Sequence, residues 1–582
     1  MPSAPFQIIF TSGWWLWEND LPWSLSRATF GTVISPKNPI FSNVDLGATC
    51  AGWIDFGPNG RIWGVIFLIA LGFLAASLFR TLNVPWVEED NYYGAIYAQA
   101  AHNNLRAGLA VTKGVPVTLY FGPLPIPRKE FYVHHPTLLP LMVTASVACF
   151  GESESAVKLV PIACSLLSAI FLWLLLRDTL GRRAAALVVV FFVTLPMELH
   201  YGDMVDFEPC LVMWMLAALL CLHRWETQPR IGWAVAAGAC CFCALWTDWP
   251  AYLFVGGISL SYLLSRVKKK RLFGIALIGL AMVTSLLFLL QIHHANPNAW
   301  EDLWTAVTMR LGNGVATGSS GAAHEGTFTF LQWGQRILHA LGENYLVSSW
   351  GFVLAGIVYL GCRMKSSPES RWIGWATLQM AIAGIPYMIL LRNWSYIHDF
   401  ASFFAMGALS ILGGLGIEWL LDWISRRSPR FRQPAFLVAL PCLFVWLATN
   451  GFIRAENQRS QFCILDGASP EPANLTPNLG RLMAQSFTPE TAILCNFDPY
   501  GSTLPYYAER TVINNLSSPE EWNAQARAKK GAVAGVIWLA SPSAAKIVES
   551  LPKQEISKVT VDGISFVLWK PENKVVDKGT GQ

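Results

Sequence analysis

Long apolar segments alternate with short polar connections along most of this chain. Because a helix needs about 20 apolar residues to cross a bilayer, about eleven segments are predicted to span a membrane. They are residues 62–80, 157–176, 184–200, 209–223, 231–247, 250–265, 272–291, 348–362, 371–391, 400–421 and 434–452. Residues 136–150 are also apolar, but they are short and begin at a proline. We interpret that stretch as a re-entrant or interfacial segment.

Composition supports this prediction. Hydrophobic residues make up 53% of the chain and charged residues only 14%, whereas a soluble domain carries about 25% charged residues. The formal net charge of +4 is too small to indicate binding to nucleic acid. The sequence therefore predicts an all-α polytopic membrane protein with additional interfacial helices.

Basic residues occupy every second connection between the predicted spans. These connections are residues 177–183, 224–230, 266–271, 363–371 and 426–432. By the positive-inside rule they are cytoplasmic, which places the N-terminus inside and the C-terminal region outside the cell. Counting residues 136–150 as a span would invert this pattern. We expect an integral protein of the inner or plasma membrane.

Three regions follow from the pattern. Residues 1–60 form an N-terminal extension to which no role can be assigned. Residues 61–452 form the membrane domain, with a large first outer loop at 81–156. Residues 453–582 have the composition of a soluble domain, in which β-rich runs alternate with helical ones, so we predict a small extracytoplasmic α/β domain. The β-rich runs are 492–494, 511–513, 535–539 and 564–569.

Carboxylates and imidazoles gather at the predicted outer boundaries of the spans. The clusters are Glu88-Glu89-Asp90, His134-His135, Asp203/Asp206/Glu208, His293-His294 and His398-Asp399. Ionisable groups collected at one membrane interface indicate chemistry or ion handling there. Each cluster also has a simpler interpretation, since acids at a helix start can act as caps and complement the helix dipole.

Three further positions bear on the site. Glu208 immediately precedes an apolar run, so its carboxylate carries a desolvation cost and needs a partner. Arg392 is suited to gripping a phosphate through paired donors, although it could also snorkel to the membrane surface. The corner at residues 246–250, WTDWP, fits an aromatic belt at the interface.

The order of these motifs resembles the GT-C glycosyltransferases related to protein O-mannosyltransferases and aminoarabinose transferases. The resemblance covers about residues 62–425. It rests on EEDNYYGAIYAQAAHNNLRAG at 88–108, YVHHPTLLPLM at 132–142, YGDMVDFEPCL at 201–211 and IHDF at 397–400. The first acid of that family is usually the Asp of a DE pair. Here the order is reversed, and both Glu89 and Asp90 are candidates for that acid. Its second acid is usually Asp, and the matching position here is Glu208.

The resemblance implies a GT-C type enzyme that transfers a sugar from a polyprenyl-phosphate carrier to an extracytoplasmic protein, lipid or glycan. A carboxylate opposite the leaving group would deprotonate the acceptor hydroxyl, which predicts inversion. We assign that base to Asp90, with Glu89 as the alternative, and expect Glu208 to orient the acceptor or help to hold a divalent ion. The candidates for substrate binding are His134, His135, Arg392, His398 and Asp399. Whether a divalent metal ion participates is left open.

A transporter or lipid flippase is the alternative function. Such proteins also place ionisable residues in the membrane, but near its midplane, on broken helices and often in repeated halves. Here the polar groups lie at one predicted face and no internal repeat is visible. The pattern therefore favours the transferase.

Overall fold

The computed structural model describes residues 60–86, 91–311, 328–427, 432–459, 474–497, 503–529, 532–551 and 556–570. Residues 1–59 of the predicted N-terminal extension lie outside the described residues. The same is true of the acidic run at 88–90, so the candidate bases Glu89 and Asp90 have no structural description.

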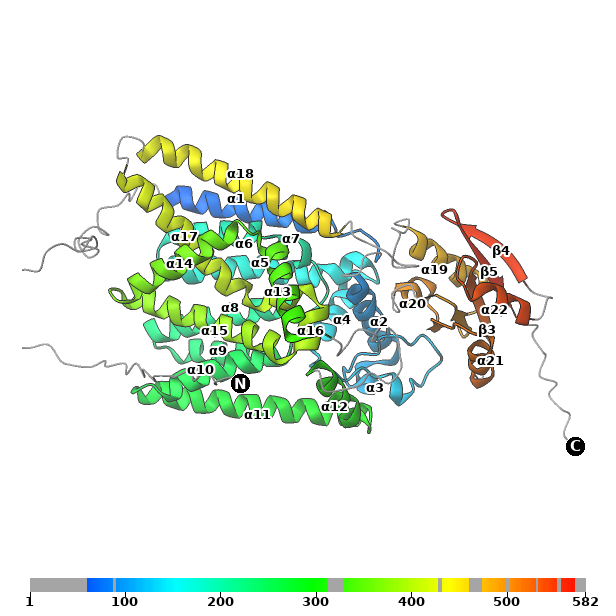
Figure 1. Cartoon of the computed structure of the whole chain (residues 1–582). Helices are drawn as coiled ribbons and strands as arrows, with labels where there is room; N and C mark the ends of the chain where they lie inside the picture. Colours follow the sequence, from blue (N-terminus) through cyan, green and yellow to red (C-terminus); the bar gives the residue numbers. More distant parts are fainter. Residues whose placement is uncertain are drawn as a thin grey trace, which may run out of the picture. The chain divides into compact units, whose positions relative to one another are not determined.

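Helices make up most of the described chain (Figure 1). The first half contains α1 (Gly60–Phe79), α2 (Asn91–Ala107), α3 (Leu109–Thr112), η3 (Arg128–Glu130), α4 (Leu138–Phe150), α5 (Glu154–Thr179), α6 (Arg182–Thr194), α7 (Pro196–Tyr201), α8 (Phe207–Thr227), α9 (Ile231–Leu245), α10 (Pro250–Leu263) and α11 (Lys268–Ala295). The next part contains α12 (Ala299–Arg310), α13 (Phe330–Tyr345), α14 (Ser349–Met364), α15 (Pro368–Leu390), α16 (Arg392–Ile397), η5 (Asp399–Ala405), α17 (Met406–Arg427) and α18 (Arg432–Arg459).

The predicted polytopic helical architecture is confirmed, but fewer helices reach spanning length than the sequence suggested. Among the described residues, seven helices are long and apolar enough to cross a membrane, or eight if α13 and α14, bent by 93°, form one broken span. The other predicted spans correspond to α6, α9 and α10, which have 13, 15 and 14 residues. Pro196 begins a separate helix after α6, and a turn at residues 246–249 separates α9 from α10.

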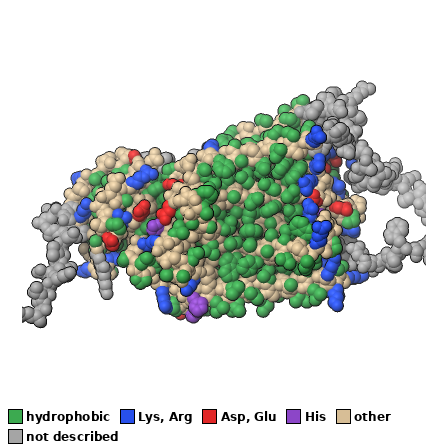
Figure 2. Space-filling model, turned by 180° about the vertical axis from the view of Figure 1, so that it is seen from behind, with side chains coloured by type: hydrophobic (Ala, Val, Ile, Leu, Met, Phe, Trp, Pro, Cys, Tyr) green, Lys and Arg blue, Asp and Glu red, His purple; other side chains and the backbone are tan. Residues whose placement is uncertain are grey.

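The surface of the helical region carries a broad apolar band, and Lys and Arg side chains gather along one edge of it (Figure 2). Large apolar residues face outward on several helices, among them Leu68 of α1, Met282 of α11 and Leu354 of α14. Soluble proteins rarely expose so much contiguous apolar surface. The band is therefore the surface expected to face lipid.

Ion pairs join the predicted cytoplasmic connections to one another. Arg183 pairs with Asp422, and Arg224 pairs with Asp178, so the ends of α5, α6, α8 and α17 meet. Lys270 of α11 also pairs with a carboxylate at the end of α8. Three of the basic connections that the sequence assigned to one side, residues 177–183, 224–230 and 266–271, therefore lie together.

Helix α6 forms the centre of the bundle. Every side chain from Ala184 to Thr194 is buried, as expected for a helix that is apolar all round. Helix α17 approaches it closely, because a Cβ added at Gly414 would lie 2.3 Å from the Cα of Val188. Small residues allow such close backbone packing between membrane helices.

The C-terminal region contains a small mixed sheet with helices. Its elements are α19 (Leu475–Ser486), β1 (Ala492–Cys495), α20 (Thr503–Ala508), β2 (Val512–Ile513), α21 (Pro519–Ala528), β3 (Val533–Trp538), α22 (Ala544–Ser550), β4 (Ile556–Val561) and β5 (Ile564–Trp569). The strand order is β2-β1-β3-β5-β4. Strand β1 runs parallel to β2 and β3, whereas β5 is antiparallel to β3 and β4.

Both faces of this sheet are covered. Ile493 and Cys495 pack into one apolar cluster with α19 and α20, and Leu494 packs into another with α21 and α22. The four β-rich runs of the sequence correspond to β1, β2, β3 and β5. The edge strand β4 was missed because it carries Lys558 and other exposed positions, and edge strands commonly carry such charges.

Candidate active site

The segment at residues 134–137 and the turn at residues 246–249, which are distant in sequence, are joined by hydrogen bonds. The turn between α9 and α10 donates two indole hydrogen bonds, from Trp249 to the carbonyl of His134 (2.9 Å) and from Trp246 to the hydroxyl of Thr137 (3.0 Å). His135 Nδ1 lies 2.8 Å from a carboxylate oxygen of Asp248. The sequence suggested an aromatic belt for this corner, but its tryptophans instead hold the histidine segment in place.

The start of α8 brings two more carboxylates to this pair. Asp206 caps α8 and accepts a hydrogen bond from the N–H of Phe207 (2.9 Å). The Phe207 ring stacks on the His135 imidazole, with ring centroids 4.6 Å apart. Asp206, Glu208 and Asp248 are 5%, 2% and 2% exposed. Three buried acids and a histidine thus form one cluster, which we call the acid cluster.

Helix α2 crosses this cluster with two tyrosines. Tyr97 packs edge-on against Phe207, with ring centroids 5.7 Å apart. The Tyr93 hydroxyl lies 3.3 Å from His398 Nδ1. The predicted site residues His135, Glu208 and His398 are therefore brought together around α2. Asp399 follows His398, and its carbonyl accepts a hydrogen bond from Asn344 (2.7 Å).

Two arginines lie where α12 and α16 meet. Asn393 donates a hydrogen bond to the carbonyl of Met309 (2.6 Å), next to Arg310 at the end of α12. Arg310 is close enough to lower the pKa values of both His134 and His135. Arg392, the predicted phosphate ligand, is exposed at the start of α16. Its role stays a prediction, and Arg310 joins it as a residue that the sequence analysis did not select.

Burial dominates the electrostatics of the site. It raises the pKa of Asp206 well above its usual range, opposed by the Phe207 N–H and reinforced by Asp248. Burial lowers the pKa of His135, and the carboxylate of Asp248 opposes that shift. Burial, with the charges of Arg310 and His135, lowers the pKa of His134 to about 3. Near neutral pH the His134 imidazole is therefore uncharged.

The lowered pKa of His134 predicts that the stability of the folded protein depends on pH. An unfolded imidazole titrates near pH 6.5, so the unfolded chain binds the proton more readily than the folded one. The stabilisation is complete above that pH and is lost as the pH falls toward 3. Between pH 7 and pH 5 the wild-type protein should lose about 1 to 2 kcal/mol through this half-buried group. Thermal unfolding at both pH values should show a smaller loss for His134→Asn; an identical loss would contradict the assignment.

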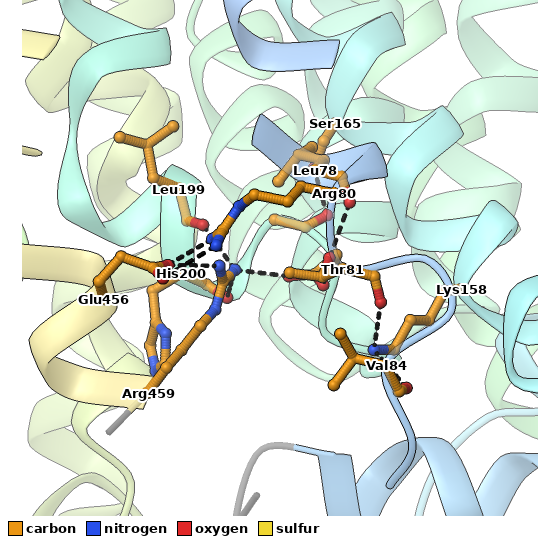
Figure 3. Close-up of polar contacts among 12 residues, drawn as sticks. Leu78, Arg80, Thr81, Val84, Lys158, Ser165, Leu199, His200, Glu456 and Arg459 are labelled. Atoms are coloured by element: carbon orange, nitrogen blue, oxygen red, sulfur yellow. Dashed lines mark hydrogen bonds and ion pairs between the residues drawn. The ribbon is translucent and has the colours of Figure 1, made fainter. Parts of the chain in front are cut away.

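Asp203 belongs to a different cluster, although it lies only three residues before Asp206. Its carboxylate accepts hydrogen bonds from Thr81 and from Arg459 (3.2 Å). Glu456 pairs with both Arg459 and Arg80 (Figure 3). This network ties the end of α1 to the end of α18. The structure therefore separates an anchoring acid, Asp203, from Asp206 and Glu208 of the acid cluster.

A pocket lined by both polar and apolar side chains adjoins the acid cluster. It encloses about 440 Å³ between the loop at residues 118–134 and helix α12. Its lining includes Tyr132 and His134 from the loop, and Thr305 and Met309 from the helix. Tyr132 stacks on His135, with ring centroids 6.1 Å apart. The loop residues thus form a wall between the pocket and the acid cluster.

The sequence left open whether a divalent metal ion takes part in the reaction. Within the described ranges, no group of three His, Cys, Asp or Glu side chains is arranged to hold a metal ion. The described residues thus do not form a metal site by themselves. The candidate acids at 88–90 lie outside these ranges.

Comparisons with known proteins agree with this architecture. Residues 134–292 match the family model of dolichyl-phosphate-mannose-protein mannosyltransferases. This segment contains His134, His135 and all three carboxylates of the acid cluster. No curated protein matches the chain.

Several solved structures share the fold. ArnT from Cupriavidus metallidurans bound to undecaprenyl phosphate has a TM-score of 0.58 and 16% identity, over 88% of this chain and 98% of that one. Its apo form gives 0.58 and 15%, over 87% and 98%. An Archaeoglobus fulgidus oligosaccharyltransferase tethered to an acceptor peptide gives 0.50 and 15%, over 81% of this chain and 69% of that one. Another structure of that enzyme is a complex with zinc and sulfate.

The matched segment and the shared fold make this chain similar to membrane glycosyltransferases of the GT-C class. The similarity to the family of dolichyl-phosphate-mannose-protein mannosyltransferases covers residues 134–292 of the chain. The transporter alternative finds no support in these comparisons.

Proposed function

We propose that this protein transfers a sugar from a polyprenyl-phosphate carrier to a hydroxyl-bearing acceptor. The observation that carries the proposal is the acid cluster, in which Asp206, Glu208 and Asp248 are buried beside His135 at the end of membrane helices. Carboxylates gathered in a buried cluster are costly and are typical of active sites. The ArnT structure with bound undecaprenyl phosphate supports the carrier class.

The proposed reaction needs one base. Asp90, or Glu89 in its place, accepts the proton of the acceptor hydroxyl while the hydroxyl oxygen attacks the anomeric carbon. The bond from that carbon to the phosphate oxygen breaks, and the polyprenyl phosphate leaves with the electron pair. Attack from the opposite face inverts the configuration. Asp90 is covalently joined to Asn91, the first residue of α2, and Tyr93 follows two residues later in the same helix.

The remaining candidates divide between the acceptor and the carrier. Glu208 is proposed to orient the acceptor. The residues proposed to bind the carrier phosphate and the sugar are His134, His135, Arg310, Arg392, His398 and Asp399. Arginine suits a phosphate because its fork of donors can bind two oxygens at once. The neutral imidazoles of His134 and His135 can donate one hydrogen bond each without adding charge.

The pocket beside Tyr132 and His134 is proposed as the approach of the acceptor. Replacing Thr305 by Trp should fill this pocket from α12 and raise the KM for the acceptor about tenfold or more, the effect of losing roughly 1.4 kcal/mol of binding. The KM for the lipid donor should change little. Thr308→Trp, three residues further along α12, is the matched control because it does not line the pocket. An unchanged acceptor KM in Thr305→Trp would contradict this assignment.

We further propose that α6 with α7, α9 and α10 also cross the membrane, giving about eleven spans, with the acid cluster and the C-terminal domain outside. The alternation of basic connections supports this orientation. In a cysteine-free variant, single cysteines at Lys268 and Glu520 distinguish the two sides. An impermeant thiol reagent on intact cells should label position 520 and not 268. Labelling of 268 alone would reverse the orientation.

The lipid donor can be tested in the cell that makes this protein. After deletion of the protein, mass spectrometry of the lipids should show an accumulating polyprenyl-phosphate sugar, with loss of that sugar from an envelope glycan, lipid or protein. The active protein should restore both. Unchanged lipids and unchanged sugar modification would contradict the proposed donor.

A further inference from the structure

Trp86 is a buried residue that precedes α2 and contacts both α5 and the C-terminal domain. Its side chain is 0% exposed. Its backbone N–H donates a hydrogen bond to the hydroxyl of Tyr507 in α20 (2.8 Å). The ammonium of Lys158 lies 5.1 Å from the centroid of its ring, and the ring of Tyr506 meets it edge-on at 6.3 Å. Trp86 therefore joins the first loop, the membrane helix α5 and the C-terminal domain.

The same tryptophan sets the position of α2. A Cβ added at Gly94 would lie 2.2 Å from the Trp86 ring, so the ring lies directly against the α2 backbone. One residue before Gly94 is Tyr93, which reaches His398, and three residues after it is Tyr97, which packs on Phe207. A shift of Trp86 would move both tyrosines relative to the acid cluster.

Tyr507 links this contact to α5. Its hydroxyl accepts the hydrogen bond from Trp86 and donates one to Glu154 at the start of α5 (2.8 Å). Its ring belongs to the apolar cluster that also contains Trp86, Tyr97 and Phe207. A second contact joins the first outer loop to the C-terminal domain: the N–H of Phe121 donates a hydrogen bond to the hydroxyl of Thr511 (3.2 Å). The C-terminal domain thus contacts the residues that support α2.

The chain just before Trp86 is fixed as well. The buried ammonium of Lys158 donates hydrogen bonds to the carbonyls of Thr81 (2.9 Å) and Val84 (3.3 Å) (Figure 3). The Thr81 hydroxyl in turn donates a hydrogen bond to Asp203, the acid that also binds Arg459 at the end of α18. With this side fixed to the membrane helices, the Tyr507 hydroxyl binds the Trp86 backbone from the C-terminal domain.

We propose that Tyr507 is a positioning residue for the transfer reaction. The C-terminal domain uses its hydroxyl to hold Trp86, and through Trp86 it sets the place of α2 against the acid cluster. The domain is therefore part of the catalytic unit and not an independent appendage. The activity part of this proposal rests on the proposed function, whereas its structural part does not.

The test compares two tyrosines in the full-length protein. Tyr507→Phe removes the hydroxyl that binds Trp86 and Glu154. Tyr262→Phe is the matched control, because the hydroxyl of Tyr262 also donates to a glutamate, Glu226 (2.7 Å), among the basic connections. We expect kcat to fall about tenfold in Tyr507→Phe, the rate equivalent of roughly one hydrogen bond, with the donor KM nearly unchanged. Tyr262→Phe should keep its kcat.

Two further variants separate positioning from general destabilisation. Glu154→Gln retains an oxygen that accepts from Tyr507 and should keep most of the activity, whereas Glu154→Ala should resemble Tyr507→Phe. Gly94→Ala pushes α2 away from Trp86 while leaving Tyr507 intact, so it should also lower kcat. Both changes act on the same series of contacts. The double variant Tyr507→Phe/Gly94→Ala should therefore raise the activation free energy by less than the sum of the two single variants.

Hydrogen–deuterium exchange supplies a readout that does not depend on the reaction. Amides of residues 92–107 should exchange faster in Tyr507→Phe than in the wild-type protein, and Tyr262→Phe should leave them unchanged. Unchanged exchange of α2 in Tyr507→Phe, or a kcat as high as that of Tyr262→Phe, would overturn the proposal. If the wild-type protein transfers no sugar, the proposed function fails, but the exchange experiment still decides whether Tyr507 positions α2.

Discussion

Asp90→Asn is expected to lower kcat by about two to four orders of magnitude, the usual contribution of a general base. The amide has nearly the same size as the carboxylate but cannot accept the proton of the acceptor hydroxyl. Protein level and donor affinity should change little, since Asp90 is not proposed to hold the carrier. Single-turnover rates of the purified variant, measured together with donor binding, separate the two effects.

Glu89→Gln is the matched comparison for this variant, because it makes the same change at the adjacent position. Near-normal turnover in Asp90→Asn together with a large loss in Glu89→Gln would assign the base to Glu89. Full activity in both variants would contradict the assignment of the base to Asp90 or Glu89.

Asp248→Asn is expected to lower kcat by about a hundredfold or more, within the usual range for acid–base groups. The carboxylate orients His135 through a 2.8 Å contact, and it shares the acid cluster with Asp206 and Glu208. The neutral amide can present its N–H to the same imidazole nitrogen and so favour the other tautomer. The Phe207 ring stacked on His135 should keep the ring in place, so donor affinity should fall less than kcat.

The control for this prediction is a histidine–carboxylate pair outside the acid cluster. His102 Nδ1 lies 3.0 Å from a carboxylate oxygen of Glu152, which is largely exposed. Glu152→Gln makes the equivalent change there and should leave kcat within about twofold, since exposed ion pairs contribute little. If Asp248→Asn were as active as Glu152→Gln, the acid cluster would have no role in the reaction.

The sequence predicted the helical membrane architecture well, because apolar length reports directly on the bilayer. It overestimated the number of long helices for a local reason. Residues 184–200 read as one apolar segment, but the segment contains Pro196, which begins a new helix. The interior of the bundle accepts such breaks because the backbone groups that they free can find partners there.

The site was predicted only in part. His135 and Glu208 were recognised from their place beside apolar runs, and the structure brings them together. Asp248 was overlooked because the tryptophans on either side of it suggested an aromatic belt, and its partner His135 lies 113 positions earlier in the chain. Arg310 was overlooked because it ends an amphipathic helix that carried no motif. Pairing across such distances is a property of the fold, which local patterns do not encode.

Neighbouring acids were also grouped too simply. Asp203 and Asp206 occupy one short connection, and proximity suggested a common role. In the structure the turn between α7 and α8 directs Asp203 to Arg459 and Asp206 to the first turn of α8. Three positions in sequence therefore separate an anchoring residue from a residue of the acid cluster.

The most direct measurement is transfer by the purified protein in detergent, supplied with polyprenyl-phosphate sugars and a panel of hydroxyl-bearing acceptors. Without any membrane gradient, the wild-type protein should release free polyprenyl phosphate and form a glycosylated acceptor, and Asp90→Asn should do so far more slowly. Cleavage of no donor in the panel, with gradient-dependent uptake of a donor into liposomes instead, would contradict the account.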